Sequence, residues 1–194
     1  MIRKVLFPLL TVALAAGLVT SAPAEEYRIA IQKLVESDMR DWIQSEQVVT
    51  AIREQNKTTA TLNQSDIDSQ DKAWRLETEG GDQKMINAVL GNALSAYLRD
   101  VQSKSGGLYT EIFVMDMKGL NVGQSDITSD YWQGDEAKWQ GAYGGGASAL
   151  LIDEVDFDDS SQAYQSQVTL AVIDPANNET IGAITVGVNV DMLD

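Results

Sequence analysis

The feature that most constrains the fold is a change of hydrophobic period at Gly106-Gly107. Before this pair, apolar residues recur every three or four positions, which is typical of amphipathic helices. After it, apolar and polar residues alternate, which is typical of strands. Helices followed by strands indicate an α+β domain with an antiparallel sheet. We therefore expect one domain at residues 25–194, with a helical part at 25–105 and a sheet part at 106–194.

The longest helical pattern covers residues 25–56, and neither proline nor glycine interrupts it. Such a helix is about 45 Å long at 1.5 Å per residue, which is more than a compact domain of this size needs. Ser65 and Asp68 match a capping box, which predicts a shorter helix that ends near Gly80-Gly81. The spacing of apolar residues predicts another amphipathic helix from Lys84 to Lys104.

Five strands are expected in the sheet part, at residues 111–115, 121–123, 149–157, 164–174 and 180–192. Lys118-Gly119 supplies a turn between the first two strands. The segment from Asp174 to Asn178 supplies the turn between the last two. Gly144-Gly145-Gly146 predicts a flexible break before the third strand.

The last two strands have one apolar face and one polar face. Valine, leucine and isoleucine fill the apolar face, which the long helix would cover. The opposite face carries small, amide and hydroxylated side chains, namely Gln167, Thr169, Ala171, Ala183, Thr185, Gly187 and Asn189. Such a face leaves space and hydrogen-bonding groups for a small polar ligand.

The connection between the second and third strands is long and rich in aromatic side chains. Such connections are usually functional or disordered, and aromatic content argues against disorder. The leading site candidate combines Tyr131, Trp132, Lys138, Trp139 and Tyr143 with a floor of Thr169 and Thr185. Lys138 would pair with a ligand carboxylate while the rings exclude water. The alternative is that the two indoles clamp the connection to the sheet.

These segments also carry a family resemblance. The turn Asp116-x-x-Gly119, the run Ser129-Asp130-Tyr131-Trp132 and the final strand pair resemble, in this order, the extracytoplasmic PAS-like sensor domains called Cache or PDC domains. The resemblance covers roughly residues 31–193. It implies helices packed on a five-stranded antiparallel PAS-like sheet, extracellular sensing, and a homodimer through the long N-terminal helix. A helix laid along the sheet without a dimer is the open alternative.

In the amino-acid-binding branch of that family, an arginine after the loop tyrosine holds the ligand carboxylate. Here Tyr131 matches the tyrosine and Trp139 the tryptophan, but no arginine follows Arg99, and Lys138 is the nearest cation. Because lysine lacks the bidentate fork of arginine, we expect looser carboxylate selection. The ligand is left open between an organic acid, an amino-acid-like solute and another small solute.

The N-terminus has the three parts of a secretory signal: Arg3 and Lys4, an apolar run at residues 5–20, and Ala22-Pro23-Ala24. Residues 1–24 are therefore expected to be a signal peptide, and the mature protein periplasmic or secreted. An uncleaved membrane anchor is the alternative. Because no second spanning stretch precedes Asp194, we expect a sensing role to need a separate membrane partner, such as a sensor kinase or a transporter.

Composition excludes several functions. The formal net charge of −15 disfavours nucleic acid and anionic membrane surfaces as partners. The chain has no cysteine and no histidine, so disulfides, the usual zinc and haem ligands, and Ser-His-Asp catalysis are ruled out. Only oxygen-ligand metals stay plausible. We expect no cofactor.

An acidic cluster lies at Asp153, Glu154, Asp156, Asp158 and Asp159. Its spacing lacks the glycine turn and the terminal glutamate of a calcium loop, so a solvated edge is the favoured interpretation over a calcium site. Nothing in the sequence positions a reactive partner for paired carboxylates, so we do not expect an enzyme. The second candidate function is a ligand-free interaction protein that recruits a partner through the apolar stripe of its long N-terminal helix.

Overall fold

The computed structural model describes residues 22–193, and most of the predicted signal peptide lies outside this range. The helices are α1 (Ala22–Leu34), a π-helical turn η1 (Val35–Met39), α2 (Arg40–Ile43), α3 (Glu46–Thr59), α4 (Gln64–Thr78), α5 (Lys84–Leu90), α6 (Ala93–Lys104) and α7 (Ala137–Gly145). The strands are β1 (Tyr109–Met115), β2 (Asn121–Gln124), β3 (Leu150–Ile152), β4 (Asp156–Asp158), β5 (Ala163–Ile173) and β6 (Thr180–Asn189). Two 3₁₀ turns complete the list, η2 (Gly146–Ser148) and η3 (Val190–Met192).

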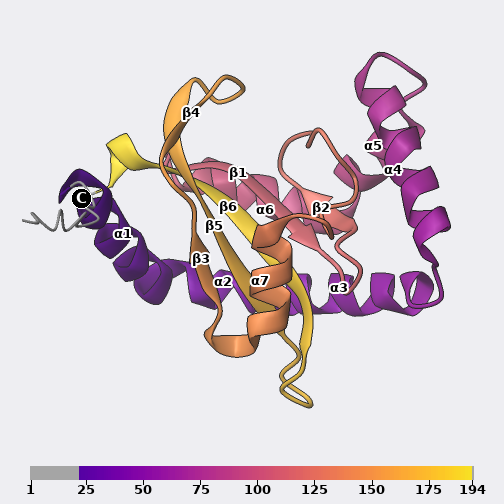
Figure 1. Ribbon diagram of the computed structural model, residues 1–194, viewed down its shortest axis with the longest axis horizontal. Coiled ribbons are helices and arrows are strands. Elements are labelled where there is room, and N and C mark those ends of the chain that lie inside the picture. Colours follow the sequence, from indigo (N-terminus) through magenta and orange to yellow (C-terminus); the bar gives the residue numbers. More distant parts are fainter. Residues whose placement is uncertain (1–21, 194) are drawn as a thin grey trace, which may run out of the picture.

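The strands form one antiparallel sheet in the order β2-β1-β6-β5-β3, and β4 pairs with the outer end of β5. The predicted α+β class with an antiparallel sheet is confirmed. In Figure 1, α3 and α6 lie behind the sheet and α7 lies in front of it. The α4–α5 pair stands beside β2, away from the centre of the sheet. No helix in residues 22–193 combines the length and apolar character needed to cross a membrane.

The main core lies between the N-terminal helices and the apolar face of the sheet, as predicted. Val168, Leu170, Ile184 and Val186 are at most 2% exposed on that face. They pack in one cluster with the helix residues Ile31, Val35, Met39, Ile43 and Ile52, which are all fully buried. The apolar stripe of the N-terminal helices is therefore used by this chain's own sheet.

The single helix predicted over residues 25–56 is wrong, because the helical segment breaks at Gln44–Ser45. The side chain of Gln44 explains the break. Its Nε2 donates to the carbonyl of Ala171 (3.2 Å), and its Oε1 accepts from the amide of Ile173 (3.1 Å). These bonds bind the helix end to β5. The new helix α3 then starts after the extended residue Ser45.

The helix predicted over residues 84–104 is also divided. It breaks at Gly91–Asn92, where Asn92 caps α6. The side-chain oxygen of Asn92 accepts a hydrogen bond from the backbone amide of Ser95 (2.8 Å), and its side-chain nitrogen donates to the carbonyl of Val122 (2.8 Å). The capping box of α4 is built from Asn63 and Asp66, two residues before the predicted pair.

Two further expectations in the sheet part need correction. The strand predicted over residues 149–157 is two short strands, β3 and β4, so the sheet has six strands rather than five. The aromatic connection is not an open loop, because its second half forms α7, which ends at Gly145 and is followed by the cap residue Gly146 with a φ of 66°. The glycines predicted as a flexible break thus include the last turn of this helix.

Candidate functional site

The polar face of the sheet lies under α7, and the strand register places its side chains in rows. One row runs from Gln124 through Phe113 and Thr185 to Thr169. The next row runs from Glu111 through Gly187 to Gln167. Because residues directly opposite one another in antiparallel strands have neighbouring side chains on one face, each row is a continuous strip of potential contacts.

Lys138, at the start of α7, reaches down to this face. Its Nζ donates to Gln167 Oε1 (2.8 Å) and lies 5.6 Å from the centre of the Phe113 ring. The Nε2 of Gln167 donates in turn to Glu111 Oε1 (2.8 Å). One neutral amide therefore bridges an ammonium and a carboxylate.

Glu111 is the charged residue of this row, and it is half-buried. Burial raises the pKa of its carboxyl above the usual value, while the hydrogen bond from Gln167 and the charge of Lys138 act in the opposite direction. Gly187 makes room for the row, since a Cβ there would lie 2.2 Å from Thr110 Oγ1 and 2.6 Å from Gln165 Oε1.

The predicted floor residues bind each other. The hydroxyls of Thr169 and Thr185 are 2.9 Å apart, and the two residues are 1% and 0% exposed. A solute would have to insert between α7 and the sheet to reach them.

An open pocket of about 310 Å³ lies next to the Glu111 row. It is lined by Asp153, Glu154, Asp156, Phe157, Asp158, Gln165 and Gln167. Gln167 thus belongs both to the pocket and to the bridge between Lys138 and Glu111. No group of three or more acidic side chains in the described part of the chain is arranged to hold a metal ion.

The indoles of the aromatic connection bind backbone carbonyls. Trp139 Nε1 donates to the carbonyl of Asp116 (3.2 Å), and the Trp139 ring stacks on Tyr143 with centroids 4.9 Å apart. Trp132 Nε1 donates to the carbonyl of Lys118 (2.8 Å). Both indoles therefore hold the connection to the β1–β2 turn, as in the clamping alternative.

Tyr131 lies elsewhere. It is 8% exposed and stacks on Trp74 of α4, with ring centroids 5.5 Å apart. The seven predicted site residues are therefore divided between two places. Lys138, Trp139, Tyr143, Thr169 and Thr185 belong to α7 and the sheet beneath it, whereas Tyr131 and Trp132 belong to a cluster around α4.

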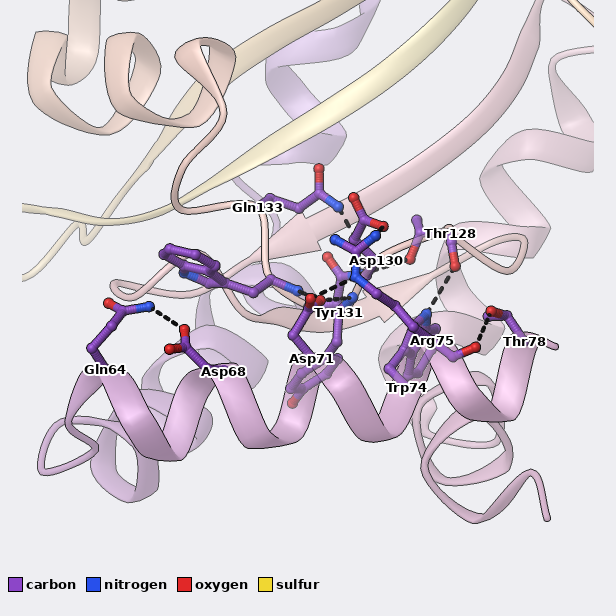
Figure 2. Close-up of polar contacts among 12 residues, drawn as sticks. Gln64, Asp68, Asp71, Trp74, Arg75, Thr78, Thr128, Asp130, Tyr131 and Gln133 are labelled. Atoms are coloured by element: carbon purple, nitrogen blue, oxygen red, sulfur yellow. Dashed lines mark hydrogen bonds and ion pairs between the residues drawn. The ribbon is translucent and has the colours of Figure 1, made fainter. Parts of the chain in front are cut away.

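Sequence reasoning missed the part that α4 has in holding the connection. Figure 2 shows Asp71, Trp74 and Arg75 of α4 facing the segment that contains Asp130 and Tyr131. The Trp74 indole also donates to the carbonyl of Thr128 (2.8 Å). The only sequence signal was the spacing of Asp71 and Arg75, which allows an ion pair across one helical turn.

A group of buried amides lies at the edge strand β2. Asn121 Nδ2 donates to Gln124 Oε1 (3.0 Å), to Thr128 Oγ1 (2.8 Å) and to the carbonyl of Asp130 (3.0 Å). Asn121 and Gln124 are fully buried, yet Asn121 Oδ1 and Gln124 Nε2 find no hydrogen-bond partner in the described part of the chain. Unpaired buried polar atoms are rare and call for an explanation.

Comparison with known proteins gives matches at the level of structure only. No protein-family model and no curated protein matches the sequence. The sensor domain of the V. cholerae histidine kinase DctB matches with a TM-score of 0.46 and 14% identity over 86% of this chain and 53% of that one. The sensory domain of the Campylobacter jejuni chemoreceptor Tlp3 matches with a TM-score of 0.39 and 13% identity over 86% of this chain and 58% of that one.

A third match covers about half of this chain. The ligand-binding domain of the Pseudomonas fluorescens chemoreceptor CtaA, in complex with L-serine, matches with a TM-score of 0.37 and 10% identity over 53% of this chain and 44% of that one. This chain therefore spans about half the length of the structures that it matches. The DctB and Tlp3 structures are a sensor and a sensory domain, and the CtaA structure is a ligand-binding domain.

Proposed function

We propose that this protein is an exported, sensory domain that binds a small solute on the polar face of the sheet, between α7 and β4. The observation that carries the proposal is the position of Gln167. Its side chain bridges Lys138 and Glu111 and also lines the open pocket of about 310 Å³. A solute in the pocket can therefore exchange hydrogen bonds with a charged network that is already assembled. Pockets with a few convergent polar groups are the usual form of small-molecule sites.

The charges around the pocket favour an amino-acid-like solute over a simple organic acid. Lys138 offers its ammonium group to a carboxylate, which would replace the neutral amide of Gln167 as its partner. The pocket rim, however, carries the carboxylates of Asp153, Asp156 and Asp158. A rim of negative charge repels a second carboxylate and attracts an ammonium group. A solute with one carboxylate and one ammonium group can bind both Lys138 and the acidic rim.

Isothermal titration of the purified protein tests the proposal. We expect L-alanine or L-serine to bind more tightly than succinate or ethanolamine. Lys138→Met should weaken binding by about tenfold or more, since a charge-assisted hydrogen bond is lost. Lys104→Met is the matched control, because Lys104 is exposed on α6 and pairs with Asp100. Absence of binding by all four probes, or equal effects of the two substitutions, would contradict this site.

The other predicted site residues do not contact the solute in this proposal. They are Tyr131, Trp132, Trp139, Tyr143, Thr169 and Thr185. The four aromatic residues hold the connection that covers the polar face, and the threonine pair forms the floor that a bound solute would approach. Tyr143→Ala should therefore weaken binding less than Lys138→Met in the same titration.

Export and signalling are also part of the proposal. We propose that residues 1–24 are removed, that the protein works in the periplasm, and that a membrane sensor kinase or transporter detects the bound state. Cell fractionation with N-terminal sequencing tests cleavage after Ala24. Crosslinking in intact cells, with and without L-serine, tests for a membrane partner.

The structure gives less support to the ligand-free interaction protein. That function needs a free apolar stripe on the N-terminal helices, but Ile31, Val35, Met39 and Ile43 are fully buried against the sheet. Ile29 remains 58% exposed. A homodimer through the N-terminal helix stays a prediction, and sedimentation of the protein and of Ile29→Glu would test it.

A further inference from the structure

The segment at residues 128–133 is held from two sides. On the sheet side, the amide of Gln133 donates to the carbonyl of Gly119 (2.7 Å), and the amide of Asn121 donates to the carbonyl of Tyr131 (3.0 Å). On the other side, the segment faces α4. It therefore lies between the sheet and α4, whereas α5 also packs directly on β2. The α4–α5 pair is named the α4–α5 arm here (Figure 1).

Asp71 of α4 holds the backbone of this segment. A single carboxylate oxygen, Oδ1, accepts the amides of both Tyr131 and Trp132 at 3.0 Å. The other oxygen, Oδ2, binds Arg75 Nε (2.7 Å), and Arg75 also pairs with Asp130 Oδ1 (2.7 Å), as Figure 2 shows. Two consecutive amides on one oxygen fix the orientation of the segment. Arg75 joins the same carboxylate to Asp130, the residue that precedes Tyr131.

The arm has a small core that is separate from the main one. Ile67 and Trp74 of α4 and Ile86 of α5 form it together with Leu120 and Tyr131. Tyr131 therefore gives its side chain to the arm while its carbonyl is bound to β2. If this segment shifts, the packing of the arm must shift with it.

Asp130 connects the two sides. Its carboxylate binds Arg75 on the arm, whereas its carbonyl accepts Asn121 Nδ2 (3.0 Å) on the sheet side and Thr128 Oγ1 (2.7 Å) within the segment. The same Asn121 side chain has the unpaired, buried Oδ1. A donor that binds this Oδ1 would act on the same amide group whose Nδ2 holds the Asp130 carbonyl.

We propose that Asp71 and Arg75 are positioning residues that latch the segment at residues 128–133, and that Asp130 couples the polar face of the sheet to the position of the α4–α5 arm. The part of this inference that concerns signalling rests on the proposed function, because it requires that a solute bound at the polar face changes the position of the arm. The latch itself exists without a solute. It can therefore be tested whether or not any solute is found.

Amide hydrogen exchange of the full protein, followed by NMR, tests the latch. We expect Asp71→Ala to speed exchange of the Tyr131 and Trp132 amides by about tenfold or more, with Asp71→Asn in between, because a charged acceptor is lost in both and the acceptor atom only in the first. Asp68→Asn is the matched control, since Asp68 lies on the same helix and binds only to Gln64 (2.7 Å) within the described chain. Unchanged exchange in Asp71→Ala would overturn the latch.

A double-mutant cycle tests the coupling. If Asp71 and Asn121 act on one unit, the double variant Asp71→Ala/Asn121→Ala should exchange more slowly at Trp132 than the product of the two single effects predicts. Effects that simply multiply would overturn the coupling. Thr128→Val, which removes the second bond to the Asp130 carbonyl, replaces Asn121→Ala if that variant does not fold.

The arm can be followed directly, because the chain has no cysteine and paired labels meet no background. Nitroxides on cysteines introduced at the exposed positions Asn87 of α5 and Gln47 of α3 should give a broader distance distribution in Asp71→Ala than in the Asp68→Asn control. An identical distribution would show that the arm is held without the latch. A failed solute screen would overturn the proposed function and leave these results standing.

Discussion

Replacing Asp116 by alanine tests how the β1–β2 turn holds the site together. The residue is fully buried, and its carboxylate accepts four hydrogen bonds. Oδ1 binds the amides of Lys118 (2.8 Å) and Leu120 (3.0 Å), while Oδ2 binds Thr59 Oγ1 (2.7 Å) and Gln55 Nε2 (3.1 Å). The first pair shapes the turn, and the second pair joins it to α3.

The loss of stability in Asp116→Ala depends on which hydrogen-bond donors lose their acceptor and cannot bind water instead. The buried Leu120 amide has no other acceptor within the described residues, and an unsatisfied buried donor costs about 1–3 kcal/mol. The Thr59 hydroxyl can turn to the carbonyl of Gln55 (3.1 Å), so it exchanges a charge-assisted hydrogen bond for a neutral one, which costs about 1 kcal/mol. Lys118 and Gln55 are half-buried, so water can replace the carboxylate there. We expect Asp116→Ala to lower the free energy of unfolding by about 3 kcal/mol. Asp116→Asn keeps one oxygen for the two amides and should cost about 1–2 kcal/mol.

Urea unfolding followed by circular dichroism measures both values, provided that the slope of the transition stays unchanged. In a thermal scan, Asp116→Ala should melt about 10 °C lower, because a domain of this size loses about 2–4 °C per kcal/mol. Asp159→Asn, which alters an exposed carboxylate near β4, is the control and should unfold like the wild type. A loss below about 1 kcal/mol for Asp116→Ala would refute the reasoning, since it would mean that the buried donors find other partners.

Three further predictions concern the polar face. Burial raises the pKa of Glu111 in the folded protein, so the wild type loses stability as the pH rises above the ordinary carboxyl pKa. Glu111→Gln should therefore be more stable than the wild type near about pH 8. In urea titrations this difference should vanish near about pH 4, where the carboxyl group of Glu111 is protonated. Gly187→Ala should lower the free energy of unfolding by about 1–3 kcal/mol, because its Cβ would meet the Thr110 hydroxyl and the Gln165 amide. The control Gly144→Ala lies in α7, where a Cβ meets no atom within 4 Å, and it should raise the free energy of unfolding by about 0.5–1 kcal/mol. Trp139→Phe removes the hydrogen bond to the Asp116 carbonyl and should lower the free energy of unfolding by about 1 kcal/mol in the same measurement. An unchanged free energy of unfolding would show that the stack on Tyr143 alone holds α7.

Periodicity predicted the sheet well, because alternation is a local property of a strand with one buried face. The strands β1, β2, β5 and β6 begin and end within a few residues of their predicted bounds. The helix breaks at Gln44 and Gly91 could not be predicted in this way. They depend on side chains that bind distant backbone groups, Gln44 at β5 and Asn92 at β2.

The site could be predicted only in part for a similar reason. Lys138 and the threonine pair share the polar face, because strand alternation and the position of the connection place them there. Tyr131 joined another cluster because Trp74, which is far from it in sequence, offers a ring to stack on and Asp71 offers a carboxylate to its amide. Neither partner can be identified from the spacing of residues.

The β1–β2 turn is where these parts meet, and this gives the proposed signalling a structural route. Its carbonyls at Asp116 and Lys118 accept the two indoles of the aromatic connection, and the Asp116 carboxylate binds α3. Gly119 accepts the Gln133 amide, and a Cβ at Gly119 would lie 2.5 Å from the Cα of Gly134. Coupling between distant sites needs a continuous set of contacts with two arrangements. A solute under α7 that moves Trp139 would act on this turn, and through it on both α3 and the segment latched to α4.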